Sequence, residues 1–489
     1  MKQRKSNKLI PIMLYLGYFI IAWWILWQTE SVDYSEWTLY IIVLAFSTLS
    51  VQILIARYAK IKIISFSGMF IIFSYVFHFA HMFLLFINYS FIDLSYGVGL
   101  YNYGEDVFRE VMNFSLLSML ALFLGMMFAP RTDTEIIQEV NNSKKDINNH
   151  LKYYGKLGII LLIISLPIDL YLLLNQIKQM GTGGYASVHE FGVNLGLKYL
   201  SYLVNPAFFL LMVANKNKRW NAQFILGIYI AYKFITMLTG MRAYAILNIL
   251  IMLYLYHSSV KKFNRKLVLF GMIVGYFILS LFIVIRNTRS YGLSFEMIYE
   301  GMLSSQGNPI LGTFEEFGLT INVVCEVVRN VGDNGLVDYA NGMQIVTSIM
   351  SAIPFVSSIF SNINFTEYNL IERLDIWHLG GSYIADFYFD FGTKGIFGIA
   401  IYGFLIQLFS QYIEKNLKQM NYYKVAMFIP AGIDIIFSVR STITKIPRVL
   451  LWIPIFMWLL EKIVTRKRHN QRISYKHIDS YPNGGKMDD

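Results

Sequence analysis

Long apolar runs recur along the whole chain and form the dominant pattern of this sequence. Most of them hold about 18 or more residues with few charges, the length at which a helix crosses a bilayer. The first run is too long for the apolar part of a signal peptide and no small-residue cleavage site follows it, so we expect a retained helix. We therefore predict an all-α, polytopic membrane helical bundle of about 12 transmembrane helices, at residues 9–28, 37–56, 63–88, 110–129, 156–177, 197–215, 221–239, 243–257, 267–285, 395–414, 425–439 and 446–463.

One long segment, residues 286–394, interrupts this pattern, and a loop of such length rarely lacks a function. Within it, residues 342–360 are apolar enough to lie along the membrane interface, to re-enter the bundle or to form a thirteenth span, and Pro354 favours a broken helix. The predicted organisation is transmembrane helices 1–9 (residues 1–285), a large extracytoplasmic loop with short or interfacial helices (286–394), transmembrane helices 10–12 (395–465) and a basic cytoplasmic tail (466–489).

Composition excludes a soluble protein, because 55% of the 489 residues are hydrophobic and only 15% are charged. The net charge of +11 is explained by cytoplasmic loops that face anionic lipid, so we expect no nucleic-acid partner. Lysine and arginine gather in alternate loops, which predicts that both termini lie in the cytoplasm. The single cysteine, Cys325, excludes an internal disulfide and a cysteine-based metal site, and we predict neither a metal nor a cofactor.

Several arginines are exceptions to the preference of lysine and arginine for cytoplasmic loops, and we predict them at the outer ends of separate hairpins. Arginine suits bidentate phosphate binding, and a lipid diphosphate would lie at this depth. The alternative is that each arginine extends to the lipid head groups on its own. The arginines are Arg242 in TGMRAY, Arg286 and Arg289 in RNTRS, and Arg440 and Arg448 on either side of Lys445.

The stretch HLGGSYIADFYFDFGTKG, residues 378–395, predicts a short polar helix before a transmembrane run. Ser382 suits its N-cap and Gly392 its C-terminal cap. Tyr383, Asp386 and Asp390 would share one face. Asp386 in a half-buried cavity could act as a general base, with His378 as a second candidate base or sugar ligand. The alternative is that the aspartate is a solvated residue at the rim of the protein, without a function.

Three further positions carry ionisable side chains. Glu315 and Glu316 in LGTFEEFGLT lie in the long loop between glycines that permit close approach of a ligand. His78 and His81 lie three residues apart in the third run without a third ligand nearby, and we interpret them as packing or interface residues. Lys233 lies in the middle of a run, and either faces the bundle or extends to the interface.

The blocks TGMRAYAILNILIMLYLY, FEEFG, LGGSYIADFYFDFGTKGIFG and IFSVRSTITKIPRVLLWIPI, in this order, resemble the bacterial O-antigen polysaccharide polymerase (Wzy) family over about residues 220–465. The resemblance implies a metal-independent glycosyltransferase of the cytoplasmic membrane, with a GT-C-like architecture. It would join oligosaccharide repeat units carried on undecaprenyl diphosphate, by block transfer at the outer face, into O-antigen or capsule. A chain-length regulator and a flippase are the implied protein partners, besides the lipid bilayer.

The resemblance also implies roles for the singled-out residues. Arg242, Arg286, Arg289 and Arg440 would hold and neutralise the diphosphate, with Arg448 as a further candidate. Asp386 or His378 would orient or deprotonate the acceptor hydroxyl, and Glu315 and Glu316 are further catalytic candidates. An O-antigen ligase would share these features. A flippase is the remaining alternative, but we find no internal repeat, and the charges cluster at the outer surface rather than at mid-membrane.

Overall fold

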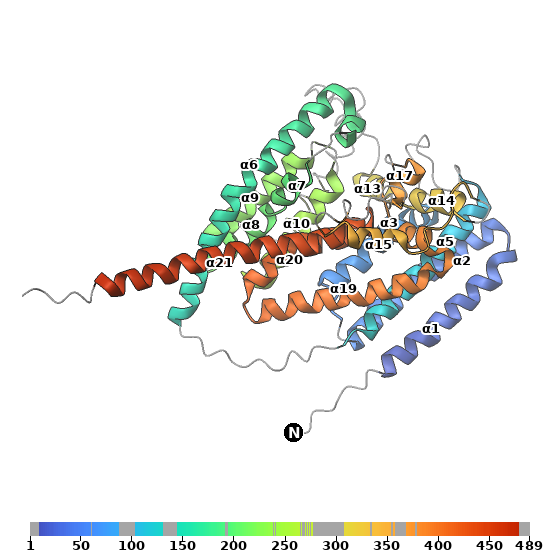
Figure 1. The fold of residues 1–489 in the computed structure, drawn as a ribbon. Helices are drawn as coiled ribbons and strands as arrows, with labels where there is room; N and C mark the ends of the chain where they lie inside the picture. The colour runs from blue at the N-terminus through green and yellow to red at the C-terminus, as the bar shows by residue number, and fades with distance from the viewer. Residues whose placement is uncertain are drawn as a thin grey trace, which may run out of the picture.

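The structure is a computed structural model in which the described residues form helices and no strand (Figure 1). One isolated bridge joins Val331 and Val337. The described ranges are 9–59, 61–87, 103–130, 144–190, 194–237, 239, 241–264, 308–332, 335–353, 368–376 and 379–478, with single residues at 356 and between 266 and 276.

The longer helices are α1 (Leu9–Gln28), α2 (Tyr34–Tyr58), α3 (Phe66–Phe86), α5 (Glu105–Phe128), α6 (Lys144–Glu190), α8 (Val204–Ala214), α9 (Arg219–Met237), α10 (Arg242–Ser259), α19 (Gly395–Lys418), α20 (Tyr422–Phe437) and α21 (Ile446–Ile478). The short ones are α7 (Leu195–Ser201), α13 (Pro309–Gly318), α14 (Ile321–Asn330), α15 (Met343–Met350), α17 (Leu370–Leu374) and α18 (Tyr383–Phe391). Three 3₁₀ turns complete the set: η1 (Thr29–Ser31), η3 (Gly392–Lys394) and η4 (Ile443–Lys445).

The prediction of an all-helical membrane protein is confirmed. Within the described residues, eight helical stretches are long and apolar enough to cross a bilayer. Helices α9, α10 and α20 also lie at predicted runs but are not among these eight. The predicted run 267–285 lies largely outside the described residues. The number of about 12 spans therefore stays a prediction.

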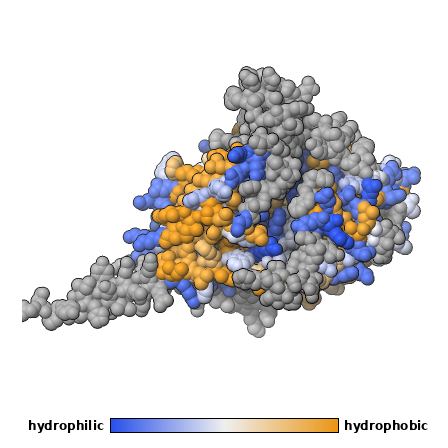
Figure 2. Space-filling model, turned by 45° about the horizontal axis from the view of Figure 1, so that its top comes forward, coloured by the Kyte–Doolittle hydropathy of each residue, from blue (hydrophilic) through white to orange (hydrophobic). Residues whose placement is uncertain are grey.

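Large apolar side chains lie on the outer surface of the bundle, as expected for a protein surrounded by lipid. Helix α1 alone exposes Leu14, Ile20, Trp23 and Trp24 by more than half of their surface. Figure 2 shows a broad apolar area on one side of the visible face, with hydrophilic residues beside it.

Inside, the helices pack around two apolar clusters. The first is built mainly from α1, α2, α3, α5, α14, α18 and α19, and the second mainly from α6, α8, α9, α10, α20 and α21. Phe73 and Phe409 pack against both. Helices α5 and α19 approach most closely at two glycines, since a Cβ on Gly125 would lie 1.8 Å from the Ala400 main-chain oxygen and one on Gly403 would lie 2.1 Å from that of Leu122.

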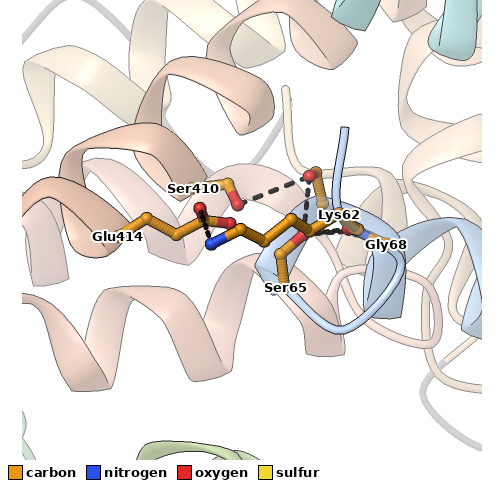
Figure 3. Close-up of polar contacts among 6 residues, drawn as sticks. Lys62, Ser65, Gly68, Ser410 and Glu414 are labelled. Atoms are coloured by element: carbon orange, nitrogen blue, oxygen red, sulfur yellow. Dashed lines mark hydrogen bonds and ion pairs between the residues drawn. The ribbon is translucent and has the colours of Figure 1, made fainter. Parts of the chain in front are cut away.

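Polar contacts tie the start of α3 to the last turns of α19 (Figure 3). Lys62 Nζ lies 2.6 Å from Glu414 Oε2. Ser65 caps α3 by accepting a hydrogen bond from the Gly68 amide at 3.2 Å. Helix α3 therefore begins at the end of the bundle where α19 finishes, and it runs to the opposite end, where the short helices lie.

Short helices gather at this opposite end (Figure 1). Helix α13 packs on α3, where the rings of Phe77 and Phe317 stack with centroids 4.7 Å apart. Helix α14 packs on α5 and α18, and α15 packs on α18, η4 and α21. Helix α15 has eight residues, too few to cross a membrane. Most of the remaining predicted segment, up to residue 360, lies outside the described residues.

Candidate functional site

Two of the predicted arginines meet at one glutamate. Arg242 begins α10, and its Nη2 lies 3.1 Å from Oε1 of Glu316 in α13. Arg440 follows α20, and its Nη1 donates to the main-chain oxygen of the same Glu316 at 3.4 Å. The turn before α10 and the turn after α20 are far apart in sequence. The expectation that guanidinium groups from separate hairpins converge is therefore met for this pair.

Helix α13 is held in place by a histidine of α3. His81 Nε2 lies 2.8 Å from the Glu315 main-chain oxygen. A Cβ on Gly318 would lie 2.2 Å from His81 Cδ2, so the close contact of the two helices requires glycine there. The Glu315 side chain is buried, whereas the Glu316 side chain keeps 19% of its surface exposed beside Arg242. Of the two predicted glutamates, Glu316 is thus the one that a ligand can reach.

The predicted glycine pair positions the turn that carries Arg440. Gly380 has φ +86°, a conformation that favours glycine. The Gly381 amide donates to the Arg440 main-chain oxygen at 3.4 Å. A Cβ on Gly381 would lie 2.7 Å from Ser441 C and from Thr442 N. The two backbones therefore run in direct contact only because residue 381 has no side chain.

Helix α18 forms with the predicted caps. The Ser382 hydroxyl accepts from the Ile384 amide at 3.2 Å, and Gly392 ends the helix with φ +59°. His78 Nε2 lies 2.8 Å from the same Ser382 hydroxyl, while its Nδ1 lies 2.9 Å from the Ser74 main-chain oxygen. Of the two interpretations of His78 and His81, packing or interface residues, the structure agrees with packing, because both are buried and hydrogen-bonded. Both also hold segments of the candidate site.

Asp386 is fully buried, which rules out the solvated-rim alternative. Its Oδ1 accepts from Gln344 Nε2 at 2.9 Å, and its Oδ2 accepts from the Ile443 amide at 2.8 Å. Asp390 Oδ1 accepts a hydrogen bond from the main-chain N–H of Gln344 at 3.1 Å, at the N-terminal end of α15. The Tyr383 hydroxyl instead contacts Ser74 Oγ at 3.3 Å. The two carboxylates therefore bind α15 and η4, while the tyrosine contacts α3.

Of the other predicted site residues, the structure describes only Arg448. Arg448 lies away from Glu316, because its Nε donates to the Ser351 main-chain oxygen and hydroxyl at 3.1 and 3.0 Å. His378, Arg286 and Arg289 lie outside the described residues. Their place at the site stays a prediction.

Lys233 faces the bundle rather than the interface. It is buried, with Nζ 5.1 Å from the ring centroid of Tyr232 and 5.6 Å from that of Tyr229. The Tyr232 hydroxyl donates to Asp169 of α6. This polar group lies among α6 and α9, apart from the arginine pair.

Sequence reasoning missed Gln344, which connects three segments through its amide N, side-chain amide and side-chain carbonyl. It also gave Asp434 no functional role, although this residue is buried in α20. Neither lies in a recognisable motif, and only an ionisable residue within an apolar run marked Asp434. Over the described part of the chain, no three histidine, cysteine, aspartate or glutamate side chains are placed to hold a metal ion.

Comparison with known proteins identifies a family. No match was found among curated proteins or among solved structures. The model of the family O-antigen polysaccharide polymerase Wzy matches residues 8–468, nearly the whole chain. The match thus also includes the part of the chain before residue 220, where the sequence blocks of the resemblance begin. An all-helical membrane bundle with an arginine pair at one end agrees with it, and the chain belongs to the O-antigen polysaccharide polymerase Wzy family.

Proposed function

We propose that this membrane polymerase joins repeat units carried on undecaprenyl diphosphate, by block transfer at the outer face of the bacterial cytoplasmic membrane. The product is a surface polysaccharide, O-antigen or capsule. The observation that carries the proposal is the meeting of Arg242 and Arg440 at Glu316. Two guanidinium groups from separate turns make a site for a diphosphate, because each can form paired hydrogen bonds with phosphate oxygens. The end of the bundle with α13, α15 and α18 then faces outward, and both termini face the cytoplasm.

The reaction needs a stabilised leaving group. An acceptor hydroxyl attacks the anomeric carbon that bears the diphosphate, the new glycosidic C–O bond forms, and the old C–O bond breaks. The electron pair of that bond leaves with the lipid diphosphate, and the hydroxyl proton passes to a base. Arg242 and Arg440 would neutralise the charge that grows on the leaving group. Arg286 and Arg289 stay candidates to complete this set, and the activity we propose uses no metal and no cofactor.

Glu316 is the predicted carboxylate best placed to take the proton. It lies against Arg242 and is partly exposed. A diphosphate carries more negative charge than one carboxylate, so on binding it can replace Glu316 as the partner of the Arg242 guanidinium. The Glu316 carboxylate is then free to accept a proton. Glu315, with a buried side chain, would support the main-chain position of its neighbour. His378 stays an alternative base.

Asp386 has a different place in this proposal. Both of its oxygens accept hydrogen bonds from protein groups, Gln344 and the Ile443 amide. In this arrangement it positions α15 and η4 rather than reaching a sugar hydroxyl. Its role as a base would need those two hydrogen bonds to open.

The rest of the proposal concerns architecture and partners. About 12 spans with the short helices above them would give a GT-C-like enzyme, fed by a flippase and limited by a chain-length regulator. A ligase that transfers finished glycan to another acceptor would use the same arginine pair and is the second candidate.

The test is the glycan ladder of cells in which variants replace the native protein. Arg242→Gln and Arg440→Gln should leave single repeat units and no long chains, with protein still present in the membrane. Arg329→Gln, an exposed arginine of α14, is the matched control and should give the normal ladder. Normal chains in both Arg242→Gln and Arg440→Gln would overturn the proposal. Accumulated long lipid-linked chains that are not passed on to their final acceptor would indicate the ligase instead.

A further inference from the structure

Asp434 of α20 carries a side-chain oxygen that no described residue of the chain contacts as a hydrogen-bond partner. The residue is 6% exposed, and its buried Oδ2 has no hydrogen-bond partner among the described residues. A buried carboxylate oxygen without a donor is costly, so it marks a place where a ligand or water supplies one. The ion pairs Lys62–Glu414 and Arg242–Glu316 do not involve Asp434.

Tyrosines from three helices lie around this carboxylate. They are half-buried, and all are close enough to Asp434 to interact with it electrostatically. The Tyr202 and Tyr244 hydroxyls are hydrogen-bonded to each other. Tyrosine rings can stack on sugar rings where a face is accessible. The four are Tyr199 in α7, Tyr202 just after it, Tyr244 in α10 and Tyr402 in α19.

Three cations lie at the same place. Lys198 of α7 lies close enough to Lys445 of η4 and to Arg448 of α21 to be repelled by both charges. Both lysines also interact with Asp434, at more than ion-pair distance. Lys445 is exposed, and its Nζ donates to Ser441 Oγ at 3.1 Å. Two of these three positive charges, Lys198 and Lys445, therefore act on Asp434, and Lys445 also acts on Asp386.

We infer that this cluster of Lys198, Lys445, Arg448 and Asp434 binds an acidic sugar of the repeat unit. The lysines and the arginine would hold its carboxylate or phosphate, the tyrosines would pack on its ring, and Asp434 Oδ2 would accept a hydrogen bond from one of its hydroxyls. The polymerase would accordingly act on an anionic glycan. This inference rests on the proposed function, because it takes the ligand to be part of the substrate.

The carboxylate of Asp434 favours an acidic sugar over a second lipid diphosphate as the ligand of this cluster. A diphosphate has several negative charges and no hydroxyl donors, so Asp434 would repel it and keep its unpartnered oxygen. A sugar with one acidic group needs fewer cations and brings hydroxyl donors. Lysine also suits a single acidic group as a point charge, whereas the paired guanidinium groups at Glu316 suit a diphosphate.

The test compares three small probes on the full-length protein in detergent, by saturation-transfer NMR and thermal shift. Methyl β-D-glucuronide and methyl β-D-glucoside differ only in the carboxylate, and farnesyl diphosphate represents the lipid carrier. The protein should bind the glucuronide at least about tenfold more tightly than the glucoside. The double variant Lys198→Gln/Lys445→Gln should lose this preference and still bind farnesyl diphosphate. Lys394→Gln, an exposed lysine of η3, is the matched control and should change nothing.

Two results would overturn the inference. One is an equal response to the two glycosides, including no response to either. The other is loss of farnesyl diphosphate binding in the lysine double variant, which would make the cluster a second diphosphate site. Lys198→Arg/Lys445→Arg keeps both charges and should retain the preference, which separates loss of charge from misfolding. If Arg242→Gln/Arg440→Gln binds farnesyl diphosphate normally while the lysine variant behaves as expected, the proposed function fails and the acidic-sugar site stands.

Discussion

Arg242 and Glu316 form an ion pair at 3.1 Å. The arginine side chain is almost fully buried and the glutamate side chain is 19% exposed. A buried guanidinium needs such a counter-charge, because an unpaired charge away from water is strongly unfavourable. A diphosphate that binds Arg242 must therefore compete with Glu316, and this competition sets the first prediction.

Glu316→Gln should bind the lipid diphosphate more tightly and polymerise more slowly. The amide removes the negative charge that competes for Arg242, and it cannot accept the proton of the acceptor hydroxyl. We expect a several-fold lower dissociation constant for farnesyl diphosphate and a fall of about 10²-fold or more in the rate of chain growth. Tighter binding with an unchanged rate would leave Glu316 as a charge partner and remove it as the base.

Gly381→Ala should abolish long chains. The added methyl group would lie 2.7 Å from backbone atoms of Ser441 and Thr442, so the turn after Arg440 must move. Overpacking of this kind costs about 1–3 kcal/mol. Gly227→Ala in α9 is the control, since a Cβ there meets nothing within 4 Å. It should leave the glycan ladder unchanged and raise the thermal unfolding temperature slightly. A normal ladder in Gly381→Ala would show that the position of Arg440 is not critical.

Polymerisation by purified protein should continue in EDTA. The leaving diphosphate would be neutralised by arginine side chains, so no divalent ion is required for this step. The measurement is the glycan ladder formed from lipid-linked repeat units with and without chelator. Loss of activity that added Mg²⁺ restores would contradict the arginine-based mechanism.

The sequence predicted the helices well because apolar length and capping are local properties. Helix α1 has the predicted bounds, and Ser382 and Gly392 cap α18 as expected. Arg440 contacts Glu316, 124 residues away in the sequence. For this contact the sequence predicted only that several arginines lie at the same outer level of the membrane. Which glutamate they meet depends on how α13 packs on α3, and no local pattern contains that information.

The environment of Asp386 was beyond sequence reasoning for a related reason. Its position on α18 follows from helical spacing, but its burial depends on Gln344, which belongs to a different helix. An ordinary glutamine gives no signal in a single sequence. The same holds for Asp434, whose surroundings come from α7, η4, α10 and α19.

Asp386→Asn should lower the thermal unfolding temperature and reduce chain growth. The new amide can accept from the Ile443 amide, but its NH₂ group then faces the NH₂ group of Gln344. Two opposed buried donors cost about 1–3 kcal/mol. Loss of activity alone would not separate a positioning role from a catalytic one, because both roles predict it.

The double variant Asp386→Asn/Gln344→Glu makes that separation. The new carboxylate at residue 344 accepts from the new amide at residue 386, and its other oxygen still accepts from the Leu370 amide, which donates to Gln344 at 2.9 Å in the native chain. A positioning role predicts recovery of both the unfolding temperature and most of the chain growth, because the hydrogen-bond pattern is restored without a carboxylate at 386. A catalytic base at 386 predicts recovery of the unfolding temperature alone. If the double variant is stable but still makes only single repeat units, Asp386 has a catalytic role.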